Sequence, residues 1–256
     1  MEEIDSVVFD LGGVLVDLDA ERCIDAFRRL GMPQIAELIN PYHPAAMIGE
    51  MEHGLITFHE ACERMRAASG RREVTDRQIG EAYGEFLVGV PAAKVRLIEA
   101  LRRRGVRTYV LSNNNPSSME LIRRMFAEAG CPMERLFDRV YLSYELRELK
   151  PSEAIFRKMI ADSGMEPART LFIDDSERNV TAARALGFEV LPCDPPRHER
   201  EGGTFYALDQ LAERADVVTF HTPLTFDGPH ATFHLAGRAF FARLRHRPVV
   251  MNSGRG

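Results

Sequence analysis

The stretch SVVFDLGGVLVD, residues 6–17, joins an apolar run to a glycine pair and an acidic side chain. The run at residues 6–11 is typical of a buried central strand, and Gly12 with Gly13 predicts a tight turn directly after it. Asp10 lies near the end of this run. Because the carboxyl ends of parallel strands line the ligand crevice of an α/β sheet, we expect Asp10 to face such a crevice.

Later segments place further polar side chains in the same way. Ser112 ends the apolar run of YVLSNNN, and Asp174 with Asp175 ends that of TLFIDDSERNV. Lys150 lies between these two segments, in ELKPSEAIF. We expect these side chains to converge with Asp10 at one edge of a parallel sheet, although more than a hundred residues separate the outermost of them.

Strand-like and helix-like patterns alternate in the second half of the chain. After a helix expected at residues 92–104, the alternation runs through VRTYVLS, MELIRRMFAEAG, RVYLS, EAIFRKMIADSG, TLFID and NVTAARALG. It predicts an α/β fold with a doubly wound parallel sheet. Between residues 19 and 90 the pattern is that of amphipathic helices, in CIDAFRRLG, IAELIN, FHEACERMRAAS and DRQIGEAYGEFLV, which predicts a small helical domain inserted after the first strand.

Length and composition favour a globular enzyme. The 256 residues, 45% of them apolar, suffice for a sizeable core, and the net charge of -5 gives no basic surplus for nucleic acid. The four cysteines lack metal-ligand spacing and are expected to be reduced thiols. No apolar run approaches a membrane span and no signal peptide is evident, so we expect a cytoplasmic protein without membrane or nucleic-acid partners.

The acidic side chains predict a magnesium site. Two carboxylates ~4 Å apart repel each other by about 4 kcal/mol at an effective dielectric constant of ~20. If Asp10, Asp174 and Asp175 converge, they therefore need a cation or protons. Oxygen ligands at a phosphate site favour Mg²⁺, which keeps several of its waters.

The remaining polar side chains suit a phosphoryl group. Lys150 and the hydroxyl of Ser112 can meet phosphoryl oxygens during transfer, and Asp10 is then left as the nucleophile, forming an acyl phosphate that water opens. Taken singly, each residue has a structural alternative: a cap or turn for Asp10, an Asn-rich turn for Ser112 and a solvated charge for Lys150. Their order in the chain favours the catalytic interpretation.

Residues 4 to about 190 resemble the haloacid-dehalogenase (HAD) superfamily of phosphohydrolases. The matching motifs are FDLGGVLVD, VLSNNN, LKPSEAIF and FIDDSERNVTAARALG. The resemblance implies a HAD-like Rossmannoid core with a helical cap that includes GEMEHGLIT. It also implies a phosphatase for a small phosphorylated metabolite, such as a sugar phosphate, with Mg²⁺ as cofactor. A dehalogenase is disfavoured, because halide displacement needs neither Mg²⁺ nor the full acidic cluster.

The same resemblance implies a role for individual residues. The implied catalytic residues are Asp10, Ser112 and Lys150. The implied phosphate-binding residues are Ser112, Asn113 and Lys150. The implied metal ligands are Asp10, the backbone carbonyl of Gly12, Asp174 and Asp175.

One position departs from the family pattern. The usual general acid/base lies two residues after the nucleophile, where this chain has Gly12, which cannot protonate a leaving alkoxide or activate water. Without a replacement, turnover would be slower by ~10²–10⁴-fold. The candidate substitutes, each of which also has a structural interpretation, are Asp17, Asp19, His43 and His53.

From about residue 185 the sequence resembles a second family. DPPR, TFHTPLT and NSGRG, in that order, are similar to the nucleotide-binding domain of erythronate-4-phosphate dehydrogenase, an NAD-dependent 2-hydroxyacid dehydrogenase. The resemblance implies that Asp194 contacts the cofactor ribose and Arg255 the substrate carboxylate. No GxGxxG motif precedes Asp194, and the catalytic Glu and His of that family have no counterpart, so complete dehydrogenase activity is not expected.

The two resemblances imply three domains. They are a HAD-like core at residues 1–17 and 91–191, a helical cap at residues 18–90, and a partial NAD-binding fragment at residues 192–256.

The two resemblances imply different pairing partners for the same edge of the TLFID strand. The strand of TLFID can pair with residues 7–10, as in the phosphohydrolase sheet, or with residues 217–220, as in the dehydrogenase sheet. We expect residues 7–10 to pair, because the metal needs Asp10 beside Asp174. Residues 217–220 and the strand at 249–252 would then lie at a sheet edge, fold aside or be poorly ordered, and could mediate self-association.

Three functional hypotheses remain. The first is the Mg²⁺-dependent phosphatase, and the second is an NAD-binding, dehydrogenase-related chimera whose phosphatase-like part is a passive scaffold. The third is an inert hybrid that self-associates. The sequence does not identify the substrate, since the side chains of the cap would select it.

Overall fold

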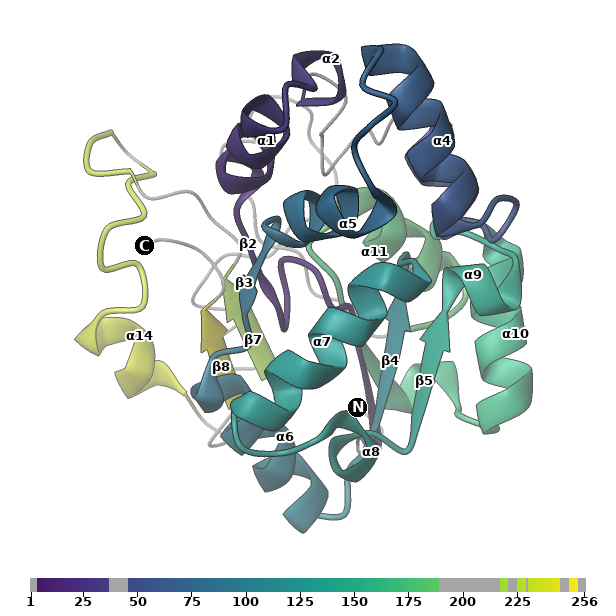
Figure 1. Ribbon diagram of the computed structural model, residues 1–256. Coiled ribbons are helices and arrows are strands. Elements are labelled where there is room, and N and C mark those ends of the chain that lie inside the picture. Colours follow the sequence, from purple (N-terminus) through teal and green to yellow (C-terminus); the bar gives the residue numbers. More distant parts are fainter. Residues whose placement is uncertain are drawn as a thin grey trace. The chain divides into compact units, whose positions relative to one another are not determined.

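Two compact units make up the chain, Met1–Phe188 and Glu189–Gly256 (Figure 1). The computed structural model describes residues 4–36, 46–188, 217–220, 225–228, 230–244 and 249–252. His43, Asp194, Arg255 and most of the strand expected in FEVLP lie outside the described residues.

A four-stranded parallel sheet forms the centre of the larger unit, in the order β5-β4-β1-β6. Its strands are β1 (Ser6–Phe9), β4 (Arg107–Ser112), β5 (Arg139–Leu142) and β6 (Thr170–Ile173). Val8 of β1 lies opposite Tyr109 of β4 and Phe172 of β6. The parallel sheet is confirmed, and so is the pairing of β1 with the TLFID strand, which brings the carboxyl ends of β1 and β6 side by side.

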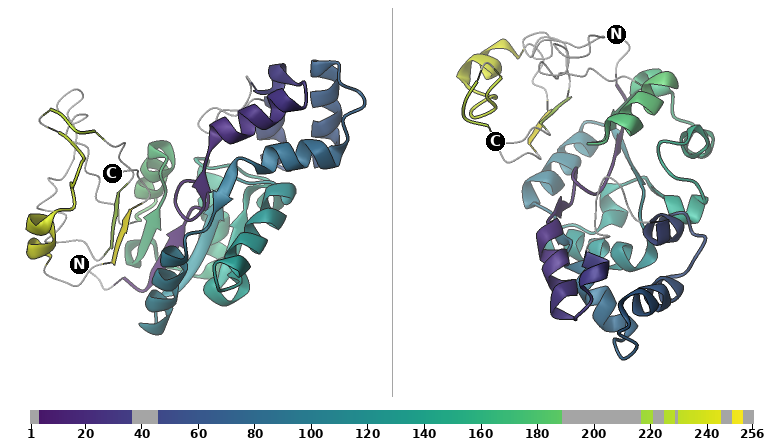
Figure 2. Two further views of the ribbon diagram at one scale, coloured as in Figure 1. Left: turned by 60° about the vertical axis from the view of Figure 1, so that its left-hand side comes forward. Right: turned by 90° about the horizontal axis from the view of Figure 1, so that it is seen from above.

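Helices lie on both sides of this sheet (Figure 2). They are α6 (Ala92–Arg103), α7 (Pro116–Glu128), α8 (Met133–Leu136), α9 (Ser143–Leu146), α10 (Glu153–Ser163) and α11 (Glu177–Ala185), with a 3₁₀ turn at Pro167–Arg169. Successive side chains of β1 point to opposite faces. Val8 packs in a core with Phe156 of α10, whereas the ring of Phe9 contacts Phe137, which contacts Phe126 of α7.

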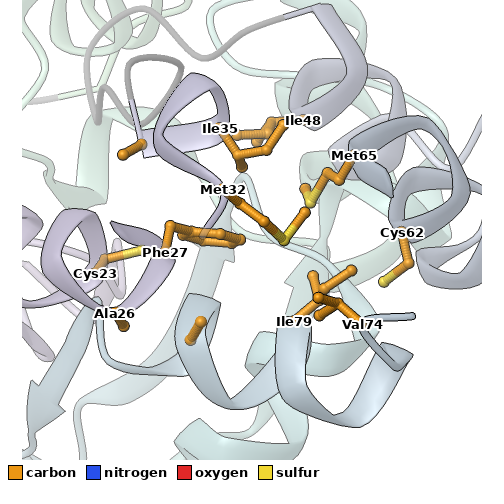
Figure 3. Close-up of a cluster of buried hydrophobic side chains, with 12 residues drawn as sticks. Cys23, Ala26, Phe27, Met32, Ile35, Ile48, Cys62, Met65, Val74 and Ile79 are labelled. Atoms are coloured by element: carbon orange, nitrogen blue, oxygen red, sulfur yellow. The ribbon is translucent and has the colours of Figure 1, made fainter. Parts of the chain in front are cut away.

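A helical insertion separates β1 from α6. Its elements are β2 (Asp17–Leu18), α1 (Ala20–Arg29), α2 (Pro33–Ala36), α3 (Ala46–Glu52), α4 (Phe58–Ser69), α5 (Asp76–Gly84) and β3 (Leu87–Gly89). Phe27, Met32 and Ile79 belong to its own buried core (Figure 3). Thr57 and Thr75 form capping boxes that begin α4 and α5. The arrowheads of β4 and β5 point toward these helices, so the insertion lies at the carboxyl edge of the sheet (Figure 1).

Two boundaries in the insertion differ from the expectation. The helix expected through GEFLV ends at Gly84, and Leu87–Gly89 instead pairs antiparallel with Asp17–Leu18. This pairing satisfies the backbone groups of both connections to the core. The helix α3, which the pattern did not single out, forms because it buries Ile48 and Met51.

The smaller unit contains β7 (Val217–Phe220), α14 (Arg238–Arg243) and β8 (Val249–Asn252). β7 and β8 pair in parallel as a two-stranded sheet, distinct from the four-stranded one. Val218 and Phe240 are buried together in a small cluster. The expectation that β1, and not β7, pairs with the TLFID strand β6 is therefore confirmed.

The thiols of Cys23, Cys62 and Cys131 are buried and form no disulfide among the described residues, and Cys193 lies outside them. None of the helices in the described part of the chain combines the length and the apolar character that a membrane crossing requires.

Amide hydrogens of β7 are expected to exchange faster than those of β1. β1 pairs on both sides, with β4 and β6, whereas β7 belongs to a two-stranded sheet, a form that is marginally stable. Hydrogen exchange on the purified chain measures the difference, and we expect residues 7–9 to be protected roughly 100-fold more than residues 217–220. Equal protection of the two strands would contradict this assignment.

Candidate active site

Three carboxylates converge at the carboxyl edge of the sheet. Asp10 directly follows β1, and Asp174 and Asp175 directly follow β6. One oxygen atom from each lies within 4.8 Å of the others, a spacing that fits a metal ion. The backbone N–H of Asp10 donates to the carbonyl of Ile173 at 2.9 Å, so the pairing of the two strands continues up to the site.

The ammonium group of Lys150 lies between two of these carboxylates. Its Nζ is 3.0 Å from Asp10 Oδ1 and 2.6 Å from Asp174 Oδ2, and it donates to the carbonyl of Leu111 at 2.8 Å. Burial by itself lowers the pKa of a lysine. At Lys150 the charges of Asp10 and Asp174 outweigh burial and raise the pKa, so the ammonium stays charged.

The carboxylates nevertheless carry an excess of negative charge. Burial, with Asp174 and Asp175 nearby, raises the pKa of Asp10, although Lys150 opposes the shift. Burial and Asp174 also raise the pKa of Asp175. Three carboxylates thus face one ammonium, and a hard divalent cation among their oxygens would offset the repulsion.

The first turn of α11 fixes the orientation of Asp174. Asp174 Oδ1 accepts hydrogen bonds from the backbone N–H of Ser176 at 2.8 Å and from Asn179 Nδ2 at 2.9 Å. Its side chain is 0% exposed. Asp174 is therefore held on both sides, by α11 and by Lys150, and cannot turn away from Asp10.

The end of β4 brings Ser112 and Asn113 beside Lys150. The buried hydroxyl of Ser112 makes a long contact, 3.4 Å, to the carbonyl of Asn113, which leaves it able to donate to a stronger acceptor. The side chain of Asn113 is already engaged, because Nδ2 donates to the Lys150 carbonyl at 3.0 Å and Oδ1 accepts from the Lys150 N–H at 2.8 Å. Asn113 thus positions Lys150, and any bond from Asn113 to phosphate would come from its backbone.

The turn after β1 allows the two strands to present their acids together. Gly13 has a φ of 72°, and a Cβ on it would overlap the carboxylate of Asp175. Only glycine fits there. At Gly12 a Cβ would lie 3.3 Å from Leu18 Cδ1, so residue 12 faces the strand that leads into the helical insertion.

Three of the candidate substitutes for the missing acid have other partners. Asp17 accepts from Lys94 Nζ at 2.8 Å, and Asp19 accepts from the N–H of Arg22 at 3.2 Å and caps α1. His53 Nε2 lies 3.0 Å from the carbonyl of Arg147. These contacts give each side chain a structural role.

Two residues near the site, Asn179 and Glu52, are not among those that the sequence predicts. Asn179 is recognisable only as a polar residue in the first turn of a helix that follows the acidic pair. Glu52, the last residue of α3, interacts electrostatically with both Asp10 and Lys150. Glu52 belongs to the stretch GEMEHGLIT, and no pattern in that stretch indicates which of its acids lies near the core.

The fold and the site together define a Rossmann-like α/β protein with an acidic site at the carboxyl edge of its sheet. Residues 4–187 match the haloacid dehalogenase-like hydrolases, and the chain belongs to this family. This match confirms the HAD-like fold that the motifs implied.

Individual relatives are similar over most of the larger unit. D-ribitol-5-phosphate phosphatase of Bacteroides thetaiotaomicron is 35% identical over 188 residues, which is 73% of this chain and 90% of the relative. A HAD-family enzyme of the same organism, crystallised with magnesium and inorganic phosphate, superposes with a TM-score of 0.69 at 36% identity, covering 75% of this chain and 94% of that one. A HAD-like hydrolase from Porphyromonas gingivalis gives 0.67 at 36% identity, covering 77% and 97%.

The C-terminal part matches a different family. Residues 177–256 match the NAD-binding domain of D-isomer specific 2-hydroxyacid dehydrogenases. Erythronate-4-phosphate dehydrogenase of Pseudomonas fluorescens is 47% identical over 79 residues, which is 31% of this chain and only 21% of that enzyme. The two matched regions overlap at residues 177–187, which include α11.

Lys150→Met is expected to lower the free energy of unfolding by ~3–5 kcal/mol at neutral pH in metal-free buffer. The substitution removes the ammonium and leaves Asp10 and Asp174 as uncompensated buried charges. Urea denaturation measures the loss. The loss should shrink as the pH falls, because Asp10, whose pKa is already raised, then takes up a proton.

Lys158→Met is the matched control for this experiment. Lys158 is 45% exposed and pairs with Glu148, so its removal should cost less than ~1 kcal/mol. Equal losses in the two variants would contradict the central position of Lys150.

Proposed function

We propose that the chain is a Mg²⁺-dependent phosphatase that hydrolyses a small phosphorylated metabolite through an aspartyl phosphate on Asp10. The observation that carries the proposal is Lys150 Nζ lying between Asp10 and Asp174 with Asp175 beside them. Further support comes from the relatives, one named a D-ribitol-5-phosphate phosphatase and another crystallised with magnesium and inorganic phosphate.

In the proposed reaction, each residue of the site has a separate chemical role. Asp10 attacks phosphorus; its side chain is 13% exposed, so substrate can reach it. Lys150 and Ser112 donate to the phosphoryl oxygens and meet the charge that develops there. Mg²⁺, held by Asp10, Asp174, Asp175 and the carbonyl of Gly12, would neutralise the acids and the phosphoryl group. Water then opens the acyl phosphate and restores Asp10.

For the substrate, we propose a sugar phosphate or sugar-alcohol phosphate. The similarity to the D-ribitol-5-phosphate phosphatase extends over 73% of this chain, so it includes most of the larger unit. We also propose that the helical insertion acts as a cap over the small substrate, because it lies at the carboxyl edge where the acids converge (Figure 1). D-ribitol 5-phosphate is the first compound to test in a panel of phosphorylated metabolites.

The purified chain is expected to release phosphate from p-nitrophenyl phosphate in the presence of Mg²⁺. Excess EDTA should abolish the activity, because the acids then repel the phosphoryl group without a cation. Asp10→Asn should lower kcat by roughly 10³-fold or more, since the amide is not a nucleophile. Absorbance of the released p-nitrophenolate at 405 nm measures the rate with Mg²⁺, the rate with EDTA and the rate of Asp10→Asn.

The control for Asp10→Asn is Asp19→Asn. Asp19 caps α1, and asparagine caps a helix about as well as aspartate. This variant should keep the activity of the unchanged chain. Equal rates with Mg²⁺, with EDTA and in Asp10→Asn would reject the phosphatase.

The match of residues 177–256 to an NAD-binding domain favours one alternative, a chain that binds NAD. We expect no heat when NAD is titrated into the purified chain in a calorimeter, because no GxGxxG loop precedes Asp194 to hold the pyrophosphate. Saturable binding in the micromolar range would favour the alternative. Gel filtration at two concentrations would detect self-association through the C-terminal strands.

A further inference from the structure

Glu52 lies where the helical insertion contacts the core. It ends α3 and is partly buried. Three contacts fix this end of α3 on the core side of the unit. The hydroxyl of Ser143 donates to the Glu52 carbonyl at 2.6 Å, and His53 Nε2 lies 3.0 Å from the Arg147 carbonyl. Gly54, at φ 73°, approaches the backbone of Tyr144 so closely that no Cβ would fit.

These contacts tie Glu52 to the same strand ends that form the site. Ser143 follows β5, and its hydroxyl also accepts a hydrogen bond from the backbone N–H of Asn114, just after β4. Asn114 lies two residues after Ser112. The backbone position of Glu52 is therefore set by bonds between the insertion and the core.

Burial and a neighbouring acid shift the titration of Glu52 toward neutral pH. Burial, followed by the charge of Asp10, raises the pKa of Glu52 to about 7, although Lys150 opposes the shift. In the same insertion, burial raises the pKa of the Tyr83 phenol of α5, and the charge of Glu52 adds to that shift. Asp174 and Asp175 act on Asp10 from the core.

The reaction needs a proton on the side of the substrate that the insertion covers. In an in-line displacement the leaving oxygen lies opposite the attacking one across phosphorus. Asp10 attacks from the end of β1, so the leaving oxygen points away from the sheet, toward the helical insertion. Gly12 supplies no acid, and Asp17 and Asp19 are held by Lys94 and the start of α1.

We propose that Glu52 is the general acid and base of the reaction, reaching the leaving oxygen from the helical insertion. This inference rests on the proposed phosphatase function. As Asp10 bonds to phosphorus, the P–O bond to the alcohol breaks, its electron pair stays on the alcohol oxygen, and that oxygen takes the carboxyl proton of Glu52. In the second step, water bonds to phosphorus, the bond to Asp10 breaks, and the Glu52 carboxylate takes the proton of the water. Phosphate leaves, and both acids return to their starting forms.

The test compares two substrates of similar size that differ in their need for an acid. Benzyl phosphate releases an alcohol that leaves poorly as an alkoxide, whereas p-nitrophenyl phosphate releases a stable anion. The parameter kcat/KM reports the steps up to departure of the alcohol. In Glu52→Gln we expect kcat/KM for benzyl phosphate to fall by ~100-fold or more, and that for p-nitrophenyl phosphate by less than ~3-fold.

A second readout follows the hydrolysis of the acyl phosphate. With p-nitrophenyl phosphate, Glu52→Gln should show a burst of about one p-nitrophenolate per active site, because the first step stays fast and the second loses its base. The control is Glu50→Gln on the same helix, whose carboxylate pairs with Arg64 of α4. This control should keep kcat/KM for both substrates within ~2-fold of the unchanged chain.

The outcomes separate this inference from the proposed function. Equal losses of kcat/KM for the two substrates in Glu52→Gln would overturn the acid role and assign Glu52 to structure or binding. No loss for either substrate would also overturn it. In both cases, activity of the unchanged chain would still support the proposed phosphatase function. If the unchanged chain hydrolyses neither substrate, the proposed function itself is wrong.

Discussion

The ion pair network around Lys150 is the interaction on which the site depends. The side chain of Lys150 is 1% exposed, and its ammonium lies between Asp10, at the end of β1, and Asp174, at the end of β6. The ammonium offsets part of the repulsion between acids that the pairing of these two strands forces together. Hydrogen bonds keep this charge arrangement in place. Asn113 bonds to the backbone of Lys150, and Ser176 and Asn179 bond to the carboxylate of Asp174.

The same pairing resolves the conflict between the two resemblances. β6 accepts one neighbour on this edge, and β1 takes it with a register in which Phe9 lies opposite Ile173. The dehydrogenase-like strands β7 and β8 pair with each other instead. A two-stranded sheet with a small buried cluster around Val218 and Phe240 offers far less buried surface than the four-stranded sheet with helices on both faces. Burial therefore favours the phosphohydrolase arrangement.

The helical insertion has its own core and its own helix caps, so its helices form largely on local grounds. Its relation to the core rests on specific contacts, among them the bond from Ser143 to the Glu52 carbonyl and the ion pair of Lys94 with Asp17. A catalytic role for Glu52 would explain how a family member with glycine at residue 12 retains an acid. The acid would then come from the insertion, so its action would require the insertion to be in place over the substrate.

The sequence by itself determined the parallel sheet, the identity and order of Asp10, Ser112, Lys150, Asp174 and Asp175, and the helical character of the insertion. These features depend on local periodicity and on the residue types at strand ends, and both can be read from the sequence. Tertiary structure alone decided that the side chain of Asn113 bonds to the backbone of Lys150, that Gly13 makes room for Asp175, and that the Glu52 carbonyl bonds to Ser143 of the core. Those facts depend on the approach of segments far apart in the chain, and neither helical nor strand periodicity encodes the approach of distant side chains.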